Sequence, residues 1–278
     1  MTAIGPDVPE ARLALPDGRT LVLGWASATD RGLRRDHNED SVLAAVPYFA
    51  VADGMGGHAA GDVASDAVIR RLAEEQARAE GGFADPEGVE PALERAVEDI
   101  LEETGDLELH AGTTVTGACL TIVSDRPYWA VFNVGDSRVY QLRGDVLEQV
   151  TVDHSVVQEM VDAGRITRAQ ADRHPDGNII TRAVGVGDAA EADYWLLPVT
   201  ARLRLLVCSD GLTKELPDAD IRGHLLHADD AATAVQRLVR GALANGGRDN
   251  VTAVVVDVLG IEPAAEAPAP ARRRGLRR

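Results

Sequence analysis

Four short motifs place an acidic side chain at one end of an apolar run with the composition of a β-strand. They are Asp53-Gly54, Gly135-Asp136, Asp210-Gly211 and, before its run rather than after it, Asp249-Asn250. A strand end fixes a side chain in place while the adjoining loop presents it to a cleft. A single Asp-Gly is more typical of a turn, but the residues after Gly54 and Gly211 do not look like return strands. The repetition therefore predicts a shared acidic site.

Asn38-Glu39-Asp40 brings further acids to the start of another strand-like run. If these carboxylates converge, their repulsion must be neutralised. Because the chain is poor in lysine, ammonium groups are not expected to do this, and a divalent cation is the simpler partner. Oxygen ligands favour Mg²⁺, Mn²⁺ or Ca²⁺ over zinc, and the spacing of a calcium-binding loop is absent. We therefore expect a magnesium- or manganese-type centre.

The elements that must position these acids are short strands grouped next to one another, with helices in separate blocks. The strands are predicted at 13–15, 21–28, 42–45, 48–52, 114–123, 129–134, 139–142, 146–150, 194–198, 203–208 and 251–258. Apolar spacing predicts helices at 61–78, 92–103, 156–163, 220–226 and 231–244. A capping box of Ser155 and Gln158 starts the third helix. This grouping is typical of an α+β fold in which helices lie outside antiparallel sheets.

The composition excludes several classes of protein. The chain has 28 basic and 45 acidic residues, a net charge of -17 and a pI near 4.8, which argues against nucleic acid as a partner. No window approaches the ~18 apolar residues of a membrane span, and Asp7 and Glu10 stand where a signal peptide would be basic. We therefore expect a soluble, cytoplasmic protein without a transmembrane segment. Cys119 and Cys208 lie in apolar runs and are expected in the core.

One domain and a tail are predicted. Residues 1–260 have the length and patterning of a layered fold around one core. Residues 261–278 are rich in Ala, Pro and Arg, with five Arg among the last seven residues, and such a segment buries too little apolar surface to fold. We interpret it as a disordered tail, either simply solvated or in contact with an acidic surface or anionic lipid.

The motifs, taken in order, resemble those of protein phosphatase 2C, the metal-dependent serine/threonine phosphatases. The matching segments are 29–40, Asp53 to His58, Gly112-Thr113-Thr114, Gly135 to Arg138, Ser209-Asp210-Gly211 and Asp249-Asn250. The chain resembles a bacterial stand-alone member, and the matches extend from about Trp25 to Val256. The resemblance implies a four-layer α-β-β-α sandwich of two antiparallel sheets flanked by helices, with two metal ions in a cleft between the sheet edges.

The resemblance also implies roles for the acids. Asp53 would bridge two ions of Mn²⁺ or Mg²⁺, the Gly54 carbonyl would bind one, and Asp210 and Asp249 would complete the other's ligands. Glu39 and Asp40 match positions that hold metal-bound water, and Asp136 matches a position linked to a third, weaker ion. A water that bridges the ions would attack phosphoserine or phosphothreonine directly, as two-metal catalysis allows.

Two other residues receive roles from the match. Arg35 would hold the substrate phosphate with its planar guanidinium. His58 would be the general acid toward the leaving oxygen. Because three residues separate His58 from Asp53-Gly54 here, a structural histidine at a helix N-terminus is the alternative. Residues 153–188 correspond to a mobile flap.

The implied partners are phosphorylated proteins, the substrates of a serine/threonine kinase in signal transduction, and the protein is expected to be a monomer. Two other functions are weighed against this one. A catalytically silent binding protein should have lost a metal ligand, but Asp53, Asp210 and Asp249 are all present. A nucleotide-binding enzyme using 54–61 as a phosphate loop would need a GK[ST] ending, which this loop lacks.

Overall fold

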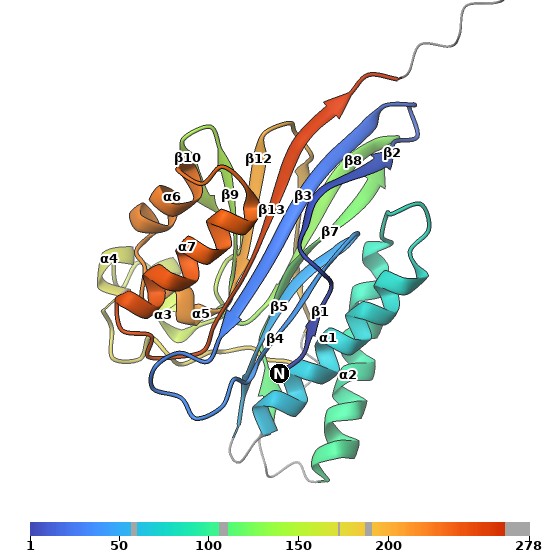
Figure 1. Cartoon of the computed structure of the whole chain (residues 1–278). Helices are drawn as coiled ribbons and strands as arrows, with labels where there is room; N and C mark the ends of the chain where they lie inside the picture. Colours follow the sequence, from blue (N-terminus) through green and yellow to red (C-terminus); the bar gives the residue numbers. More distant parts are fainter. Residues whose placement is uncertain (57–59, 106–110, 172, 187–190, 265–278) are drawn as a thin grey trace, which may run out of the picture.

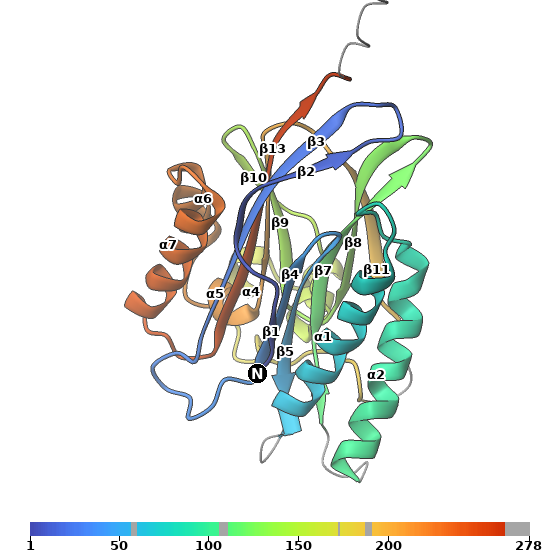
Figure 2. The ribbon, with the colours of Figure 1, turned by 45° about the vertical axis from the view of Figure 1, so that its right-hand side comes forward.

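Two β-sheets lie face to face, and each carries helices on its outer side (Figures 1 and 2). The computed structural model describes residues 1–56, 60–105, 111–171, 173–186 and 191–264. The first sheet has the order β1-β4-β5-β7-β8-β11, with β6 beside β5, and the second has the order β10-β9-β12-β13-β3-β2. This is the predicted four-layer α-β-β-α sandwich.

The strands of the first sheet are β1 (Ala3–Ile4), β4 (Asp40–Ala45), β5 (Tyr48–Met55), β6 (Gly112–Thr113), β7 (Val115–Val123), β8 (Arg126–Val134) and β11 (Asp193–Pro198). Those of the second are β2 (Val8–Ala14), β3 (Thr20–Asp30), β9 (Arg138–Arg143), β10 (Val146–Gln149), β12 (Leu203–Cys208) and β13 (Val251–Glu262). β1 pairs with β4 in parallel, so the first sheet is mixed, whereas the sequence predicted antiparallel pairing throughout.

The helices form two outer layers. α1 (Ala60–Arg78) and α2 (Val89–Thr104), preceded by the short η1 (Pro86–Gly88), cover the first sheet. α6 (Asp218–Leu226) and α7 (Ala231–Ala244) cover the second. Three shorter helices, α3 (Val156–Asp162), α4 (Arg168–Ala171) and α5 (Asp210–Thr213), lie near one end of the sandwich. Among the described helices, none is long and apolar enough to cross a membrane.

Three apolar layers hold the sandwich together. The middle layer joins the inner faces of both sheets, and the outer two lie beneath the helix pairs. In the middle layer Phe49 makes edge contacts with Trp25 and Trp129, at centroid distances of 5.5 and 5.9 Å. Such aromatic pairs contribute about 0.5–1.5 kcal/mol beyond the area they bury. Cys119 and Cys208 are buried, as predicted.

Local signals start several elements where the sequence predicts them. The Ser155 side chain accepts a hydrogen bond from the Gln158 N–H (3.3 Å), which satisfies a free donor at the start of α3. The hairpins β2–β3 and β9–β10 are also present. β13 extends four residues past the predicted end, because a bulge after Val258 lets Gly260–Glu262 keep pairing with β3. Most of the predicted tail, 265–278, lies outside the described residues.

The connections that carry the acidic motifs gather at one end of the sandwich, in the lower part of Figure 1. Residues 31–39 cross from β3 to β4, and 135–137 cross from β8 to β9, so both pass from one sheet to the other. The residues after β12 and before β13 reach the same end, since these strands are antiparallel neighbours. The fold thus brings together motifs that lie far apart in the chain.

Candidate active site

A polar cavity of about 960 Å³ opens at this end of the sandwich. Its lining includes the predicted site residues Arg35, Glu39, Asp53, Gly54, Asp136, Asp210 and Asp249. The sixth predicted acid, Asp40, is not part of this lining and is fully buried. His58, the eighth predicted side chain, lies outside the described residues. The described site residues therefore converge as the sequence predicts.

Asp40 and Asp53 stand directly opposite each other on β4 and β5. Two like charges at such a position repel each other. The Ser209 hydroxyl donates a hydrogen bond to Asp40 Oδ2 at 2.9 Å, but among the described residues nothing donates to its buried Oδ1. An unsatisfied buried carboxylate oxygen is costly, so this pair is suited to a bound cation.

Asp136 is placed by the crossing from β8 to β9 and is 7% exposed. Gly135 has a φ of 108°, and its N–H donates to His154 Nδ1 at 3.1 Å. The hydroxyls of Ser137 and Thr114 are hydrogen bonded to each other at 2.8 Å. These contacts fix the turn on both sides of the carboxylate, so Asp136 points into the cavity from a rigid segment.

The carboxyl groups at the floor of the site are harder to ionise than ordinary ones. Burial raises the pKa of Asp40 to about 7 and that of Asp136 to about 8, and the negative charge of Asp210 adds to both shifts. Burial, together with the charges of Asp40, Asp210 and Asp136, raises the pKa of Asp53 well above its usual range. Burial also raises the pKa of Glu39. Groups with such shifts are concentrated at functional sites.

The acids of the second sheet are each paired with a basic side chain. Lys214 forms an ion pair with Asp210 Oδ2, and Arg35 Nη2 donates to Asp249 Oδ2 at 2.8 Å. The buried Oδ1 of Asp210 has no donor among the residues that the structure describes. The sequence motifs do not single out Lys214, and the expectation that ammonium groups do not neutralise the acids is wrong for Asp210. The sequence feature that points to Lys214 is that it is the only lysine of the chain.

The donor set fits Mg²⁺ or Mn²⁺, since it consists of hard oxygens, some of them buried and unsatisfied. In the part of the chain that the structure describes, no three His, Cys, Asp or Glu side chains already form a metal-binding group. Asp210 and Asp249 each have one oxygen engaged by a basic side chain. In the described part of the chain, the acids therefore line one cavity but do not surround a single metal position.

Two glycines of the motifs are required by close packing. A Cβ at Gly54 would lie 2.0 Å from the carbonyl oxygen of Gly61 and 2.6 Å from that of Glu39. A Cβ at Gly211 would lie 1.9 Å from the carbonyl oxygen of Asn250. A Cβ cannot lie this close to a carbonyl oxygen, so neither position can hold a residue with a side chain. The motifs Asp53-Gly54 and Asp210-Gly211 therefore need glycine to bring their acids against the facing loops.

Asn250 fastens the loop that carries Arg35 and Glu39. Its Oδ1 accepts from the Glu39 N–H at 2.8 Å, and its Nδ2 donates to the carbonyls of Arg31 and His37, both at 2.9 Å. The sequence interpretation used Asn250 only as part of a motif and did not assign it this role. In the sequence, an Asn next to a predicted ligand and before a buried strand is only a weak indication of this role. The hydrogen bonds of Asn250 in the structure establish it.

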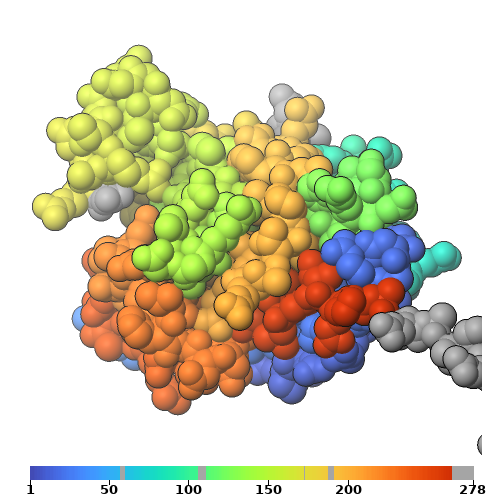
Figure 3. All heavy atoms as spheres, turned by 90° about the horizontal axis from the view of Figure 1, so that it is seen from above, coloured from blue at the N-terminus to red at the C-terminus, as the bar shows by residue number. Residues whose placement is uncertain are grey.

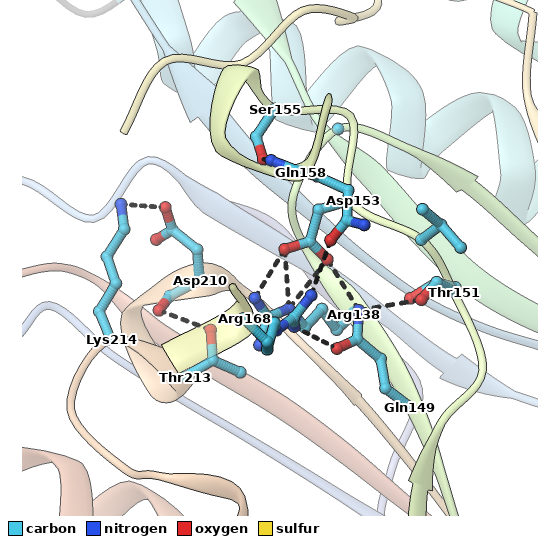
Figure 4. A network of polar contacts seen from close by, with 12 residues as sticks. Arg138, Gln149, Thr151, Asp153, Ser155, Gln158, Arg168, Asp210, Thr213 and Lys214 are labelled. Carbon is cyan, nitrogen blue, oxygen red and sulfur yellow. Dashed lines mark hydrogen bonds and ion pairs between the residues drawn. The ribbon is translucent and has the colours of Figure 1, made fainter. Parts of the chain in front are cut away.

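The predicted flap begins on a polar network at the edge of the cavity (Figure 4). Arg138 binds Asp153 through two nitrogens, at 2.9 and 2.6 Å, and Gln149 donates to the same carboxylate at 2.8 Å. Arg168 of α4 donates to Gln149 and to Gln158 of α3, at 2.8 and 2.7 Å. The segment with α3 and α4 projects from the body of the molecule (yellow-green in Figure 3). Its described part is thus tied to the second sheet through Gln149.

Known proteins share this fold and these motifs. The sequence pattern of the family described as Protein phosphatase 2C matches residues 27–253. The chain belongs to this family. At 42% identity over 242 residues it matches the serine/threonine protein phosphatase PstP of Mycobacterium tuberculosis, over 86% of this chain and 46% of that protein. The chain thus spans about half the length of PstP.

Shorter relatives and solved structures match over most of their length. The serine/threonine phosphatase stp of Listeria monocytogenes is 35% identical over 240 residues, which are 82% of this chain and 93% of that one. A crystal structure of the M. tuberculosis phosphatase PstP/Ppp has a TM-score of 0.78 at 39% identity, covering 86% of this chain and 99% of that chain. The catalytic domain of PstP in complex with 2 manganese ions has a TM-score of 0.76 at 38% identity, covering 87% and 100%.

Proposed function

We propose that the protein is a metal-dependent protein serine/threonine phosphatase, which hydrolyses phosphoserine and phosphothreonine in proteins. The observation that carries this proposal is the convergence of five predicted acids at one cleft, with Asp40 buried opposite Asp53 and with buried oxygens left unsatisfied. Family membership and the named activities of the relatives support it.

Asp53, the Gly54 carbonyl, Asp210 and Asp249 would hold two ions of Mn²⁺ or Mg²⁺, with Glu39 and Asp40 beside them. The manganese ions of the PstP structure favour Mn²⁺. When bound, such ions supply an activated water and stabilise charge on the phosphoryl oxygens. Asp136 would hold a third ion, but the positive charge of Lys214 already acts on that carboxylate.

Arg35 is placed to receive the phosphate. Its side chain is 49% exposed, and one nitrogen is anchored on Asp249, which orients the guanidinium at the cavity. A planar guanidinium can bind two phosphate oxygens at once. His58 keeps the proposed role of general acid. Phosphorylated substrates of a serine/threonine kinase, a cytoplasmic location and a monomeric state also remain proposals.

The proposal is tested by assaying a phosphothreonine peptide with Mn²⁺, with Mg²⁺ and with EDTA. Turnover is expected with either ion and should fall to background with EDTA, because the proposed ligands are hard oxygens. EDTA already saturated with Mn²⁺ is the control, and it should leave turnover intact. Turnover without metal would contradict the proposal, whereas peptide binding without turnover would favour the silent binding protein.

Replacing Arg35 by Ala is expected to raise KM for the phosphopeptide about tenfold, the effect of one charge-assisted hydrogen bond. Both ions should stay bound, since Asp249 is retained. Arg34→Ala, in the same exposed stretch, is the matched control and should leave KM unchanged. A fall in kcat would add a transition-state role for Arg35. Equal KM values for both variants would remove Arg35 from the phosphate site.

A further inference from the structure

The chain contains a single lysine, and this lysine lies in the acidic cleft. All other basic residues that make up the 28 are arginines. Lys214 follows the last turn of α5, and its backbone N–H donates to the Asp210 carbonyl at 2.8 Å. Its side chain turns back to the carboxylate of the same residue (Figure 4). The first residue of α5 and the residue that caps its end are thus the acid and its counter-ion.

The ammonium group of Lys214 lies in the same cavity as several acids. It lines the cavity together with Asp53, Asp136 and Asp210. Burial opposes its charge, but Asp210, Asp136 and Asp53 together raise the pKa of Lys214 above its usual value. In turn, Lys214 offsets part of the shift in the pKa of Asp136. Asp136 and Asp210, which are 7% and 9% exposed, therefore line the same cavity as this one positive charge, which is held on Asp210.

Counted over the six predicted acids, Arg35 and Lys214, the charges balance with two metal ions. The six predicted acids, when ionised, carry six negative charges, and Arg35 and Lys214 each pair with one of them. The four charges that remain equal those of two divalent cations. A third divalent ion would leave the cluster with an excess of two positive charges, which would weaken its binding.

The residue type also fits this position. An ammonium is a compact point charge with three donors, whereas a guanidinium is broad and planar. Next to the Asp210 carboxylate, a compact charge can occupy the position that a small cation would otherwise take. The one position of the chain with lysine in place of arginine is therefore the one where the shape of the cation matters most.

We propose that the ammonium of Lys214 replaces a third divalent cation beside Asp136 and Asp210, so that the cleft of this chain is complete with two metal ions. This inference rests on the proposed two-metal phosphatase site. It departs from the expectation, drawn from the family resemblance, that Asp136 would bind a third ion.

The test is calorimetric titration of the metal-free full chain with Mn²⁺, which counts ions without using activity. Wild type should bind two equivalents. Lys214→Met removes the charge while keeping a long side chain, and should bind a third equivalent at least about tenfold more tightly than wild type does. Adding Asp136→Ala to Lys214→Met should return the count to two. Lys214→Arg, which keeps the charge, should stay near two.

If Lys214→Met does not fold, as judged by circular dichroism, Lys214→Gln is titrated in its place. Three equivalents in wild type, or the same count and affinity in wild type and the neutral variants, would overturn the role of Lys214 and leave the phosphatase proposal standing. A third ion that persists without Asp136 would also overturn it. Wild type that binds no Mn²⁺ would contradict the proposed function itself, and this inference with it.

Discussion

Asp53→Asn is expected to lose Mn²⁺ binding and to lower phosphatase turnover by at least about 10²–10³-fold, the loss typical when a group that stabilises transition-state charge is removed. Asp53 faces Asp40 across the β4–β5 ladder and lines the cavity. Asparagine has nearly the same size but no charge, so the fold should survive while the site loses the carboxylate proposed to bridge two cations.

The measurements are Mn²⁺ titration and phosphopeptide turnover of the same preparation. Asp145→Asn is the matched control, because Asp145 also adjoins a glycine but lies in the turn between β9 and β10, outside the cavity lining. It should bind metal and turn over as wild type does. If Asp53→Asn did the same, Asp53-Gly54 would be an ordinary turn.

Gly211→Ala is expected to destabilise the protein by about 3 kcal/mol and to displace Asp210, which is a large effect for one methyl group. The added Cβ would lie 1.9 Å from the carbonyl oxygen of Asn250. Neither backbone segment can give way freely, because Asn250 also holds the loop of Glu39. Thermal unfolding should therefore shift downward by several degrees, and Mn²⁺ affinity should fall as well.

Gly223→Ala is the control for this substitution. Gly223 lies within α6, and an added Cβ there meets nothing among the described atoms within 4 Å. Since alanine favours a helix over glycine by about 0.5–1 kcal/mol, this variant should be as stable as wild type or slightly more so. A Gly211→Ala protein with wild-type stability would show that the α5 turn can shift away from Asn250.

Local sequence patterns predict most of the fold and the acidic residues of the site. The apolar runs that end at Asp53 and Asp210 can be recognised without knowledge of distant contacts. The Ser155 cap is also local, because its partner lies within the first turn of α3. α5 was not predicted, since four residues are too few to show a helical period. Its start at Asp210 became visible only in the structure.

The long-range pairings could not be predicted in the same way. That Asp40 stands opposite Asp53 depends on strand register. The contact of Asn250 with the Glu39 N–H joins residues 211 positions apart. The pairing of Lys214 with Asp210 spans only four residues, but its importance depends on Asp136, which comes from the connection between β8 and β9. Such features follow from topology rather than from composition.

The place of β13 sets the order in which the site can form during synthesis. This strand, 251–262, lies between β3 and β12 in the second sheet, and Asn250 at its start holds the loop that carries Glu39. Until the ribosome has released these residues, β3 and β12 lack their shared neighbour, and Asp249 is missing from the cleft. Chains that emerge from the amino end fold in that direction. A nascent chain that has not reached Asp249 therefore cannot complete the acidic cleft, however much of the two sheets it has already formed.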